Sequence, residues 1–175
     1  MESTMMHMIA QPLAVVRKNH ALEHATLQVL AAKHTPSSRL LGYSDPGGFW
    51  VVGTVDTEAL TIAAQEALQR LQGGEAQLAI HPNCGTNLAT SGFLAGTAAW
   101  LAMAGTKKGF RNWLDRFPLV VTMVTMALMI AQPLGLRMQA VVTTDAKVNG
   151  LKIIQVTKYD GRMQPVHRVS THFGA

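Results

Sequence analysis

The chain has 175 residues, the length of about one domain. Hydrophobic residues make up 48% and charged residues only 14%, against roughly 25% charged in a soluble globular domain, and the mean hydropathy is +0.16. These values exclude a disordered chain and predict that part of it lies in an apolar solvent. The net charge of +5 is scattered with no nucleic-acid recognition motif, and the single cysteine, Cys84, excludes an intramolecular disulfide.

The first predicted element is a helix over residues 12–34, with Pro12 in its first turn and Pro36 beyond its end. An apolar stripe at steps of three and four residues runs along it and includes two histidines. The members of this stripe are Leu13, Val16, His20, His24, Leu27 and Ala31. A second apolar stripe lies on the far side, so we expect the helix to pack on two faces.

Short elements follow, separated by turn residues. They are a β-hairpin of strands 40–43 and 49–55, a helix that begins at Asp56 or Thr57 and ends at Gly73, and a strand over 77–81. The SDPGG turn sets the hairpin, and a regular apolar face predicts that the helix packs on the sheet.

The most apolar part of the chain predicts two transmembrane helices. No charged residue occurs from Ala76 to Thr106, and none occurs from Phe117 to Leu136. The second stretch makes a helix roughly 30 Å long, the thickness of a hydrocarbon core, and the first spans about 88–105. Gly92 and Gly96, four residues apart, would let another helix approach closely. The alternative is a buried helical hairpin in a soluble protein.

The loop between the two stretches has the composition of a membrane interface. Aromatic and apolar residues fall on one helical side and polar residues on the other, the first set being Phe110, Trp113, Leu114 and Phe117. Its basic residues, Lys107, Lys108, Arg111 and Arg116, would be cytoplasmic by the positive-inside rule. That orientation places about 80 residues across the membrane, yet the first 16 residues are not typical of a signal peptide. The two arguments conflict, and the orientation stays open.

After the membrane pair we expect strands over 140–144 and 151–158 around an Asn149-Gly150 turn. The predicted fold class is an α+β membrane protein: a small αββαβ layer, a two-helix transmembrane hairpin, and C-terminal strands that return to the sheet. The expected parts are an extramembrane domain over 1–85, the hairpin over 86–136, the returning strands over 137–160 and a tail over 161–175.

The sequence His20-Ala21-Leu22-Glu23-His24 is the sharpest chemical signal. Residues four apart share a helix face, so both imidazoles can reach one metal ion. Glu23 is close enough in sequence to orient a metal-bound water or take its proton. The alternative is that each ring bonds a backbone carbonyl or a water in the core.

A catalytic zinc needs a third protein ligand. His81 and Cys84 are the nearest candidates in the expected topology, and Glu58, Glu66 and Glu75 are others. The alternative for His81 and Cys84 is a connector whose thiol packs as a small apolar group.

Five segments together resemble an uncharacterised bacterial membrane-protein family, a domain of unknown function. They are NHALEHATLQVL at 19–30, HPNCGTNLATSG at 81–92, RFP at 116–118, QPLG at 132–135 and VTT at 142–144. The resemblance covers roughly residues 17 to 157. It implies a two-span membrane protein and supplies no activity.

The five residues HALEH also resemble the motif of the inverted-motif zinc peptidases, the pitrilysin and insulinase group. That resemblance implies His20 and His24 as zinc ligands and Glu23 as general base. In those enzymes a distant downstream glutamate completes the site, and this chain has none at an obviously matching place.

We therefore expect a membrane-bound metallohydrolase, with zinc held by His20, His24 and His81, and with Glu23 activating water at the bilayer surface. One alternative is a non-catalytic membrane subunit or scaffold with structural histidines, partnered with another helix or a second copy through Gly92 and Gly96. Another alternative is a metal-storage or metal-sensing protein. The expected location is the cell membrane, and nucleic acid is not an expected partner.

Overall fold

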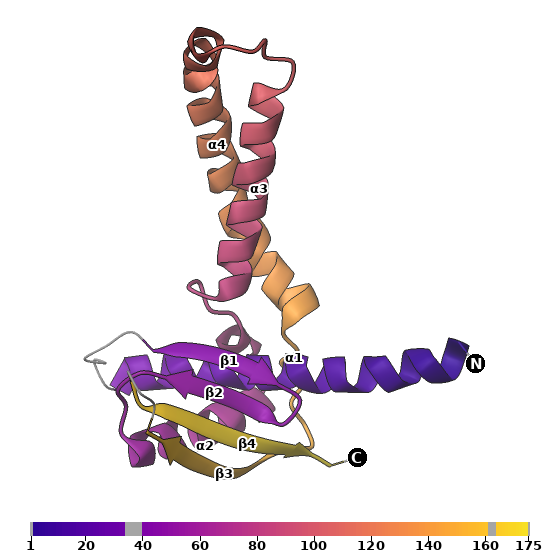
Figure 1. Ribbon diagram of the computed structural model, residues 1–175. Helices are drawn as coiled ribbons and strands as arrows, with labels where there is room; N and C mark the ends of the chain where they lie inside the picture. The colour runs from indigo at the N-terminus through magenta and orange to yellow at the C-terminus, as the bar shows by residue number, and fades with distance from the viewer. Residues whose placement is uncertain (1, 34–39, 161–163, 175) are drawn as a thin grey trace. The chain divides into compact units, whose positions relative to one another are not determined.

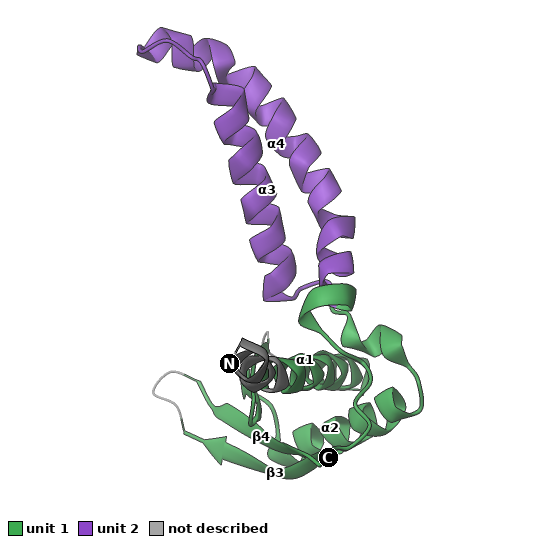
Figure 2. Ribbon diagram, turned by 90° about the vertical axis from the view of Figure 1, so that its right-hand side faces the viewer, with its two compact units in different colours: residues 1–81, 140–175 green, residues 82–139 purple. Residues whose placement is uncertain are grey.

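The computed structural model describes residues 2–33, 40–160 and 164–174. The protein is a mixed helix and sheet structure with four α-helices and a four-stranded sheet in these residues. The chain divides into two compact units, unit 1 with residues 1–81 and 140–175 and unit 2 with residues 82–139 (Figure 2).

Unit 1 contains two α-helices, the sheet and two short helical segments (Figure 1). Its elements are α1 (Glu2–Lys33), β1 (Leu41–Asp45), β2 (Gly48–Val52), α2 (Thr57–Gln72), the 3₁₀ segment η1 (Ala76–Ala79), β3 (Leu151–Tyr159) and β4 (Val166–Phe173). The π-helical segment η2 (Gln139–Thr143) joins the two units. The sheet is antiparallel throughout, in the order β1-β2-β4-β3.

The core of unit 1 lies between one face of the sheet and the two helices. Phe49 pairs with Val169 and Val51 pairs with His167, and all four are completely buried. Residues of α1 and α2 close this layer, among them Leu22 and the short stripe of alanines on α2. The helices thus cover one face of the sheet, while Trp50 and Tyr159 contact each other as neighbours on the opposite face.

Several sequence predictions for unit 1 are confirmed. The hairpin of β1 and β2 forms, and Asp56 caps α2 by accepting a hydrogen bond from the Ala59 backbone at 2.8 Å. α2 ends at Gly73, as predicted.

Other predictions for unit 1 are wrong. α1 begins at Glu2, ten residues earlier than expected, so Pro12 lies inside the helix, where it removes one backbone hydrogen bond. His34 and Pro36, the predicted helix end, lie outside the described residues. Residues 77–81 form no strand; η1 occupies this segment, because its carbonyls bond side chains of α1 instead of a neighbouring strand.

The C-terminal part also differs from the prediction. Residues 140–144 are not a strand, because η2 continues the preceding helix through Thr143. The partner of β3 is β4, which occupies residues 166–173 of the segment expected to be a tail. The alternation of Val166, Arg168 and Ser170 with the buried His167 and Val169 is a strand pattern that the tail interpretation overlooked.

Unit 2 is a pair of long helices, α3 (Gly85–Met103) and α4 (Phe110–Met138). Small residues form the buried contact, with Ala98 and Ala102 of α3 facing α4. The closest approach is at Gly135, where an added Cβ would lie 3.2 Å from the Asn87 Cα. Gly92 and Gly96 instead face open space, so their predicted role with a partner helix stays a prediction.

The surface of unit 2 is unusually apolar. Phe93 and Trp100 of α3 are 74% and 70% exposed, and Met129 of α4 is 71% exposed. In the described part of the chain, one helix, Phe110–Thr143, is long and apolar enough to span a membrane, and only 11% of its most apolar window is buried. One of the two expected spans therefore has the length and hydropathy that a transmembrane helix needs. The other, α3, does not reach that hydropathy because it contains many small and polar residues.

Candidate metal site on α1

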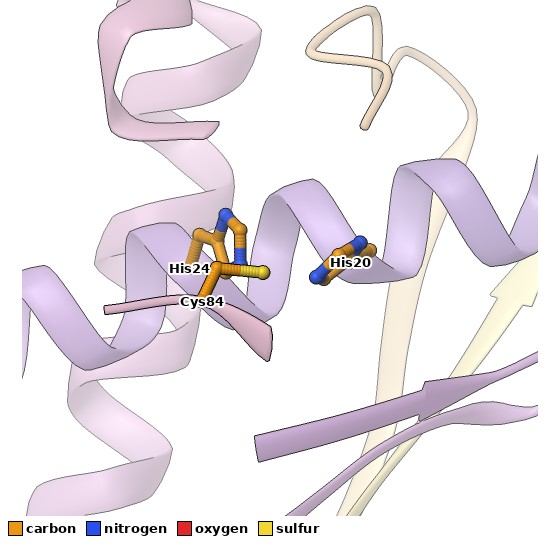
Figure 3. A group of neighbouring side chains, drawn as sticks. All are labelled: His20, His24 and Cys84. Carbon is orange, nitrogen blue, oxygen red and sulfur yellow. The ribbon is translucent and has the colours of Figure 1, made fainter. Parts of the chain in front are cut away.

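His20 and His24 lie one helical turn apart near the centre of unit 1 (Figure 3). Their ring centroids are 4.3 Å apart with an angle of 63° between the planes. A ring nitrogen of each lies within 4.8 Å of one from the other. His24 is buried and His20 is half-buried. The shared helix face predicted from the sequence is therefore present.

Both rings are held by backbone carbonyls. The His24 Nδ1 lies 2.7 Å from the Ala79 oxygen in η1, and the His20 Nδ1 lies 3.0 Å from the Thr143 oxygen in η2. Because a carbonyl only accepts hydrogen bonds, each ring donates from Nδ1, and a neutral ring with its proton on Nδ1 has its lone pair on Nε2. Histidine ligands of metal ions are usually oriented in this way, with one nitrogen donating to a carbonyl and the other on the metal.

His81 joins the pair from the segment after η1. Its ring centroid is 5.8 Å from that of His24, with an angle of 43° between the planes. Gln28 fixes this segment against α1 by donating hydrogen bonds to the carbonyls of Leu78 and Ile80. The ring of His24 thus has the rings of His20 and His81 as neighbours in unit 1.

Cys84 belongs to unit 2, although only two residues separate it from His81. At about 3.5 Å per residue, the chain itself keeps the Cα atoms of Cys84 and His81 within roughly 10 Å of each other. The Cys84 sulfur, labelled in Figure 3, caps α3 by accepting a hydrogen bond from the Thr86 backbone at 3.4 Å. The thiol therefore acts as a hydrogen-bond acceptor, whereas the sequence favoured simple apolar packing of its side chain.

The three glutamates considered as ligands lie elsewhere. Glu66 pairs with Lys33 and Arg70, and Glu75 accepts two hydrogen bonds from Arg70. The hydrogen bonds from Arg70 lower the pKa of Glu75. Glu58 is exposed in the first turn of α2. None of the three is grouped with the histidines in the described residues.

Glu23 is buried, with 5% of its surface exposed, and packs on β1. Its carboxylate accepts a hydrogen bond from the Ser44 hydroxyl, and an added Cβ at Gly42 would lie 2.8 Å from the Glu23 Cγ. Glu23 thus contacts the sheet, while the rings of His20 and His24 are held by η2 and η1. No sequence pattern marks this contact, since Gly42 contributes no side chain to it.

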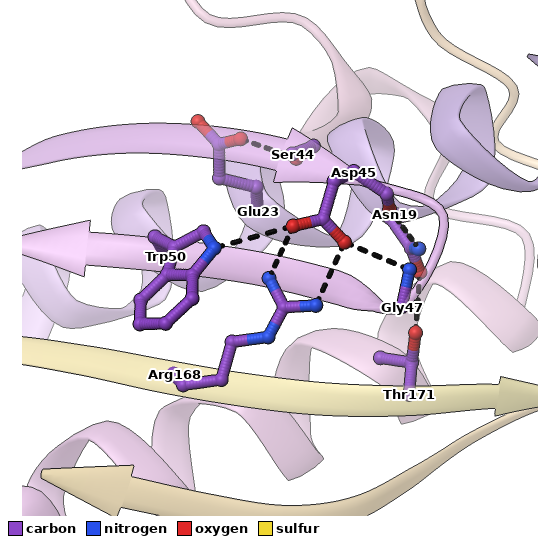
Figure 4. A network of polar contacts seen from close by, with 8 residues as sticks. All are labelled: Asn19, Glu23, Ser44, Asp45, Gly47, Trp50, Arg168 and Thr171. Carbon is purple, nitrogen blue, oxygen red and sulfur yellow. Dashed lines mark hydrogen bonds and ion pairs between the residues drawn. The ribbon is translucent and has the colours of Figure 1, made fainter.

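Asp45 anchors a second polar network, between the β1–β2 turn and β4 (Figure 4). It makes two hydrogen bonds of 2.7 Å with Arg168 and accepts others from Trp50 and Gly47. The hydrogen bond from Arg168 is the main reason that the pKa of Asp45 is lowered. Since its carboxylate is committed to Arg168, Asp45 stabilises the turn and is a poor candidate for a ligand.

The fold and the site define an α+β protein with a histidine cluster on its central helix and a helical hairpin with an apolar surface. The chain belongs to the family described as a domain of unknown function, DUF6391, whose model matches residues 15–156. It is 44% identical over 102 residues to an uncharacterised protein of Picosynechococcus sp. (strain ATCC 27264 / PCC 7002 / PR-6). That match covers 51% of this chain and 49% of the relative, so the chain matches about half of the length of that protein. No solved structure matches the chain.

Proposed function

We propose that the protein is a two-span membrane protein whose α+β unit binds a divalent transition-metal ion through His20, His24 and His81. The carrying observation is the convergence of these rings, with centroid separations of 4.3 and 5.8 Å along the cluster. Three neutral imidazoles are a common ligand set for zinc, with the fourth position left to water.

The carbonyl contacts of His20 and His24 are those that a structural role predicts, and they are also the usual way in which metal-bound histidines are oriented. Both carbonyl contacts use Nδ1, so they orient each Nε2 for a metal. Two ligand nitrogens on a tetrahedral zinc lie roughly 3.4 Å apart, from zinc–nitrogen bonds near 2.1 Å. Small ring rotations reach that spacing from nitrogens within 4.8 Å.

Chain connectivity supports two spans where hydropathy supports one. β2 precedes α3, β4 follows α4, and the two strands pair in one sheet. Both flanks of the hairpin therefore lie on the same side of a membrane, and the chain must cross it an even number of times. If α4 crosses, α3 crosses too; its 19 uncharged residues make a helix about 28 Å long.

Cysteine labelling tests this topology. In a Cys84→Ser background, Thr106→Cys and Ser170→Cys should react with a membrane-impermeant maleimide from opposite sides of sealed vesicles. Labelling of both positions from the same side would contradict two spans.

Hydrolysis is a second candidate function, favoured by the burial of Glu23, which directly precedes His24 in the sequence. In that role a metal would supply an acidic water, and Glu23, released from Ser44, would serve as the general base. Glu23→Gln should then abolish hydrolysis of a peptide or similar amide while zinc binding persists. Unchanged hydrolysis in Glu23→Gln would remove this candidate and leave metal binding in place.

Zinc titration of the full chain, purified in detergent without an affinity tag, tests the main proposal. We expect one zinc per chain, lost in the double variant His20→Ala, His24→Ala and retained in His172→Ala, a matched change on β4. Circular dichroism checks that the double variant keeps its helix content. Equal zinc binding by the folded double variant and the native chain would overturn the proposal.

A further inference from the structure

The start of α4 presents a surface that the metal site does not use. This tip surface consists of Lys107, Lys108, Phe110, Arg111, Trp113, Arg116 and Phe117. It belongs entirely to unit 2, between the end of α3 and the uncharged part of α4.

Aromatic rings form a continuous row along one side of the tip surface. The rings of Phe110 and Trp113 are stacked with centroids 6.2 Å apart, and Trp113 and Phe117 follow at 6.0 Å. Phe110 is 75% exposed, so the row faces outward. Exposed rings in such a row are typical of side chains that lie at the level of lipid headgroups.

The basic residues lie on the other side of the first two turns of α4 and in the residues before it. Four cations face one acidic residue, Asp115, in this segment. None of the four forms an ion pair within the part of the chain that the structure describes. Their charge is therefore available to an anion outside the protein.

The amphipathic segment ends where the all-apolar helix begins. From Phe117 onward α4 has no charge until Arg137, and most of its exposed side chains are apolar. This change marks the boundary between headgroups and hydrocarbon, since an amphipathic turn suits the first and an apolar helix the second.

We propose that the tip surface binds the headgroups of anionic phospholipids in the leaflet that the hairpin reaches. The inference rests on the two-span part of the proposed function and is independent of the metal site. Charge complementarity selects anionic over zwitterionic lipid, and the aromatic row places the cations at headgroup depth.

Fluorescence quenching by brominated lipids tests this proposal. The full chain is reconstituted in phosphatidylcholine vesicles with an equal fraction of dibrominated phosphatidylglycerol or dibrominated phosphatidylcholine. Subtracting the emission of Trp113→Phe from that of the native chain isolates Trp113, because Trp50 and Trp100 are unchanged. We expect brominated phosphatidylglycerol to be enriched at Trp113 by roughly fivefold, the factor that one basic residue near an anionic surface supplies.

Neutralising the tip surface should remove this preference. In the variant Lys107→Gln, Lys108→Gln, Arg111→Gln, Arg116→Gln, both brominated lipids should quench Trp113 equally. A control variant removes three exposed cations of unit 1 and should keep the preference for brominated phosphatidylglycerol. Its changes are Lys147→Gln, Lys152→Gln and Lys158→Gln.

Each remaining outcome contradicts the proposal in a distinct way. Equal quenching of the native chain by both lipids would overturn anionic selectivity while leaving the membrane spans intact. Absence of quenching by either lipid would show that Trp113 lies away from the bilayer, which would also overturn the two-span proposal. If the preference for brominated phosphatidylglycerol persisted in the neutralised variant, residues outside the tip surface would be its source.

Discussion

Unit 1 buries large apolar side chains, whereas unit 2 exposes several of them. In unit 1, Phe49 and Leu22 are fully buried between helices and sheet. In unit 2, Phe93, Trp100 and Met129 are each at least 70% exposed, and the helix contact is made by alanines. Water favours the first arrangement, whereas a contiguous exposed apolar surface requires a lipid or protein partner.

Polar groups divide in the same way. Unit 1 holds its buried polar side chains in defined hydrogen bonds, such as those of Asn19 with Asp45 and Thr171. Threonine hydroxyls of the unit 2 helices bond carbonyls of their own helix, as Thr97 does with Phe93 and Thr122 with Pro118. Internal satisfaction of this kind is the arrangement that a helix needs in an apolar solvent.

The largest expected effect comes from comparing two Phe→Ala changes. Phe49→Ala should lower the free energy of unfolding by about 3–5 kcal/mol, because it leaves a cavity in the core of unit 1. Phe93→Ala on α3 should change it by less than about 0.5 kcal/mol, because the ring is already exposed. Urea denaturation in mild detergent, followed by circular dichroism, measures both. Similar losses would break the distinction between the units.

A smaller difference should appear between two Gly→Ala changes. At Gly48 the backbone has a φ of 137°, and an added Cβ would lie 2.0 Å from the Val169 oxygen, so Gly48→Ala should cost about 3 kcal/mol. At Gly92 nothing lies within 4 Å, and alanine is the better helix former by about 1 kcal/mol, so Gly92→Ala should be neutral or stabilising.

The same denaturation series measures both glycine variants. A destabilising Gly92→Ala would indicate that a second helix already packs closely against this side of α3, as the sequence suggested for Gly92 and Gly96.

The smallest effect concerns pH and should appear in unit 1. His167 is fully buried; its Nε2 lies 3.0 Å from the Thr57 hydroxyl, and its Nδ1 has no hydrogen-bond partner among the described residues. Burial lowers the pKa of His167 below 6.5, with Lys158 adding to the shift and Asp56 opposing it. The unfolded chain therefore binds the proton more readily, so stability should be complete above pH 6.5 and should fall as the pH drops towards the folded pKa.

Urea midpoints between pH 7.5 and pH 5 measure this loss. His167→Gln should flatten the dependence, while the exposed His172→Gln should retain it. An unchanged slope in His167→Gln would assign the acid sensitivity to other groups.

Local patterns in the sequence predicted much of unit 1. The SDPGG turn predicted the hairpin, and Asp56 and Gly73 predicted the two ends of α2. These predictions succeeded because turn and cap residues determine the conformation of the few residues beside them. The pairing of β4 with β2 depends on contacts across more than a hundred residues of chain, which no local pattern records. Residues 140–144 have the β-branched composition of a strand, yet continuity with α4 makes them helical.

The candidate site was predictable where it depends on helix spacing. His20 and His24 converge because residues four apart share a face. The carbonyls of Ala79 and Thr143 that orient the rings were not predictable, since any residue carries a carbonyl. The position of Glu23 was also hidden, because its slot is made by the missing side chain of Gly42.

Cobalt substitution tests the central claim, a metal site built from the histidines of α1, most directly. One Co²⁺ per chain should give the intense visible bands of a tetrahedral ion, and these should vanish in His20→Ala, His24→Ala but persist in His172→Ala. Weak bands of octahedral cobalt, identical in the native chain and the double variant, would contradict the site.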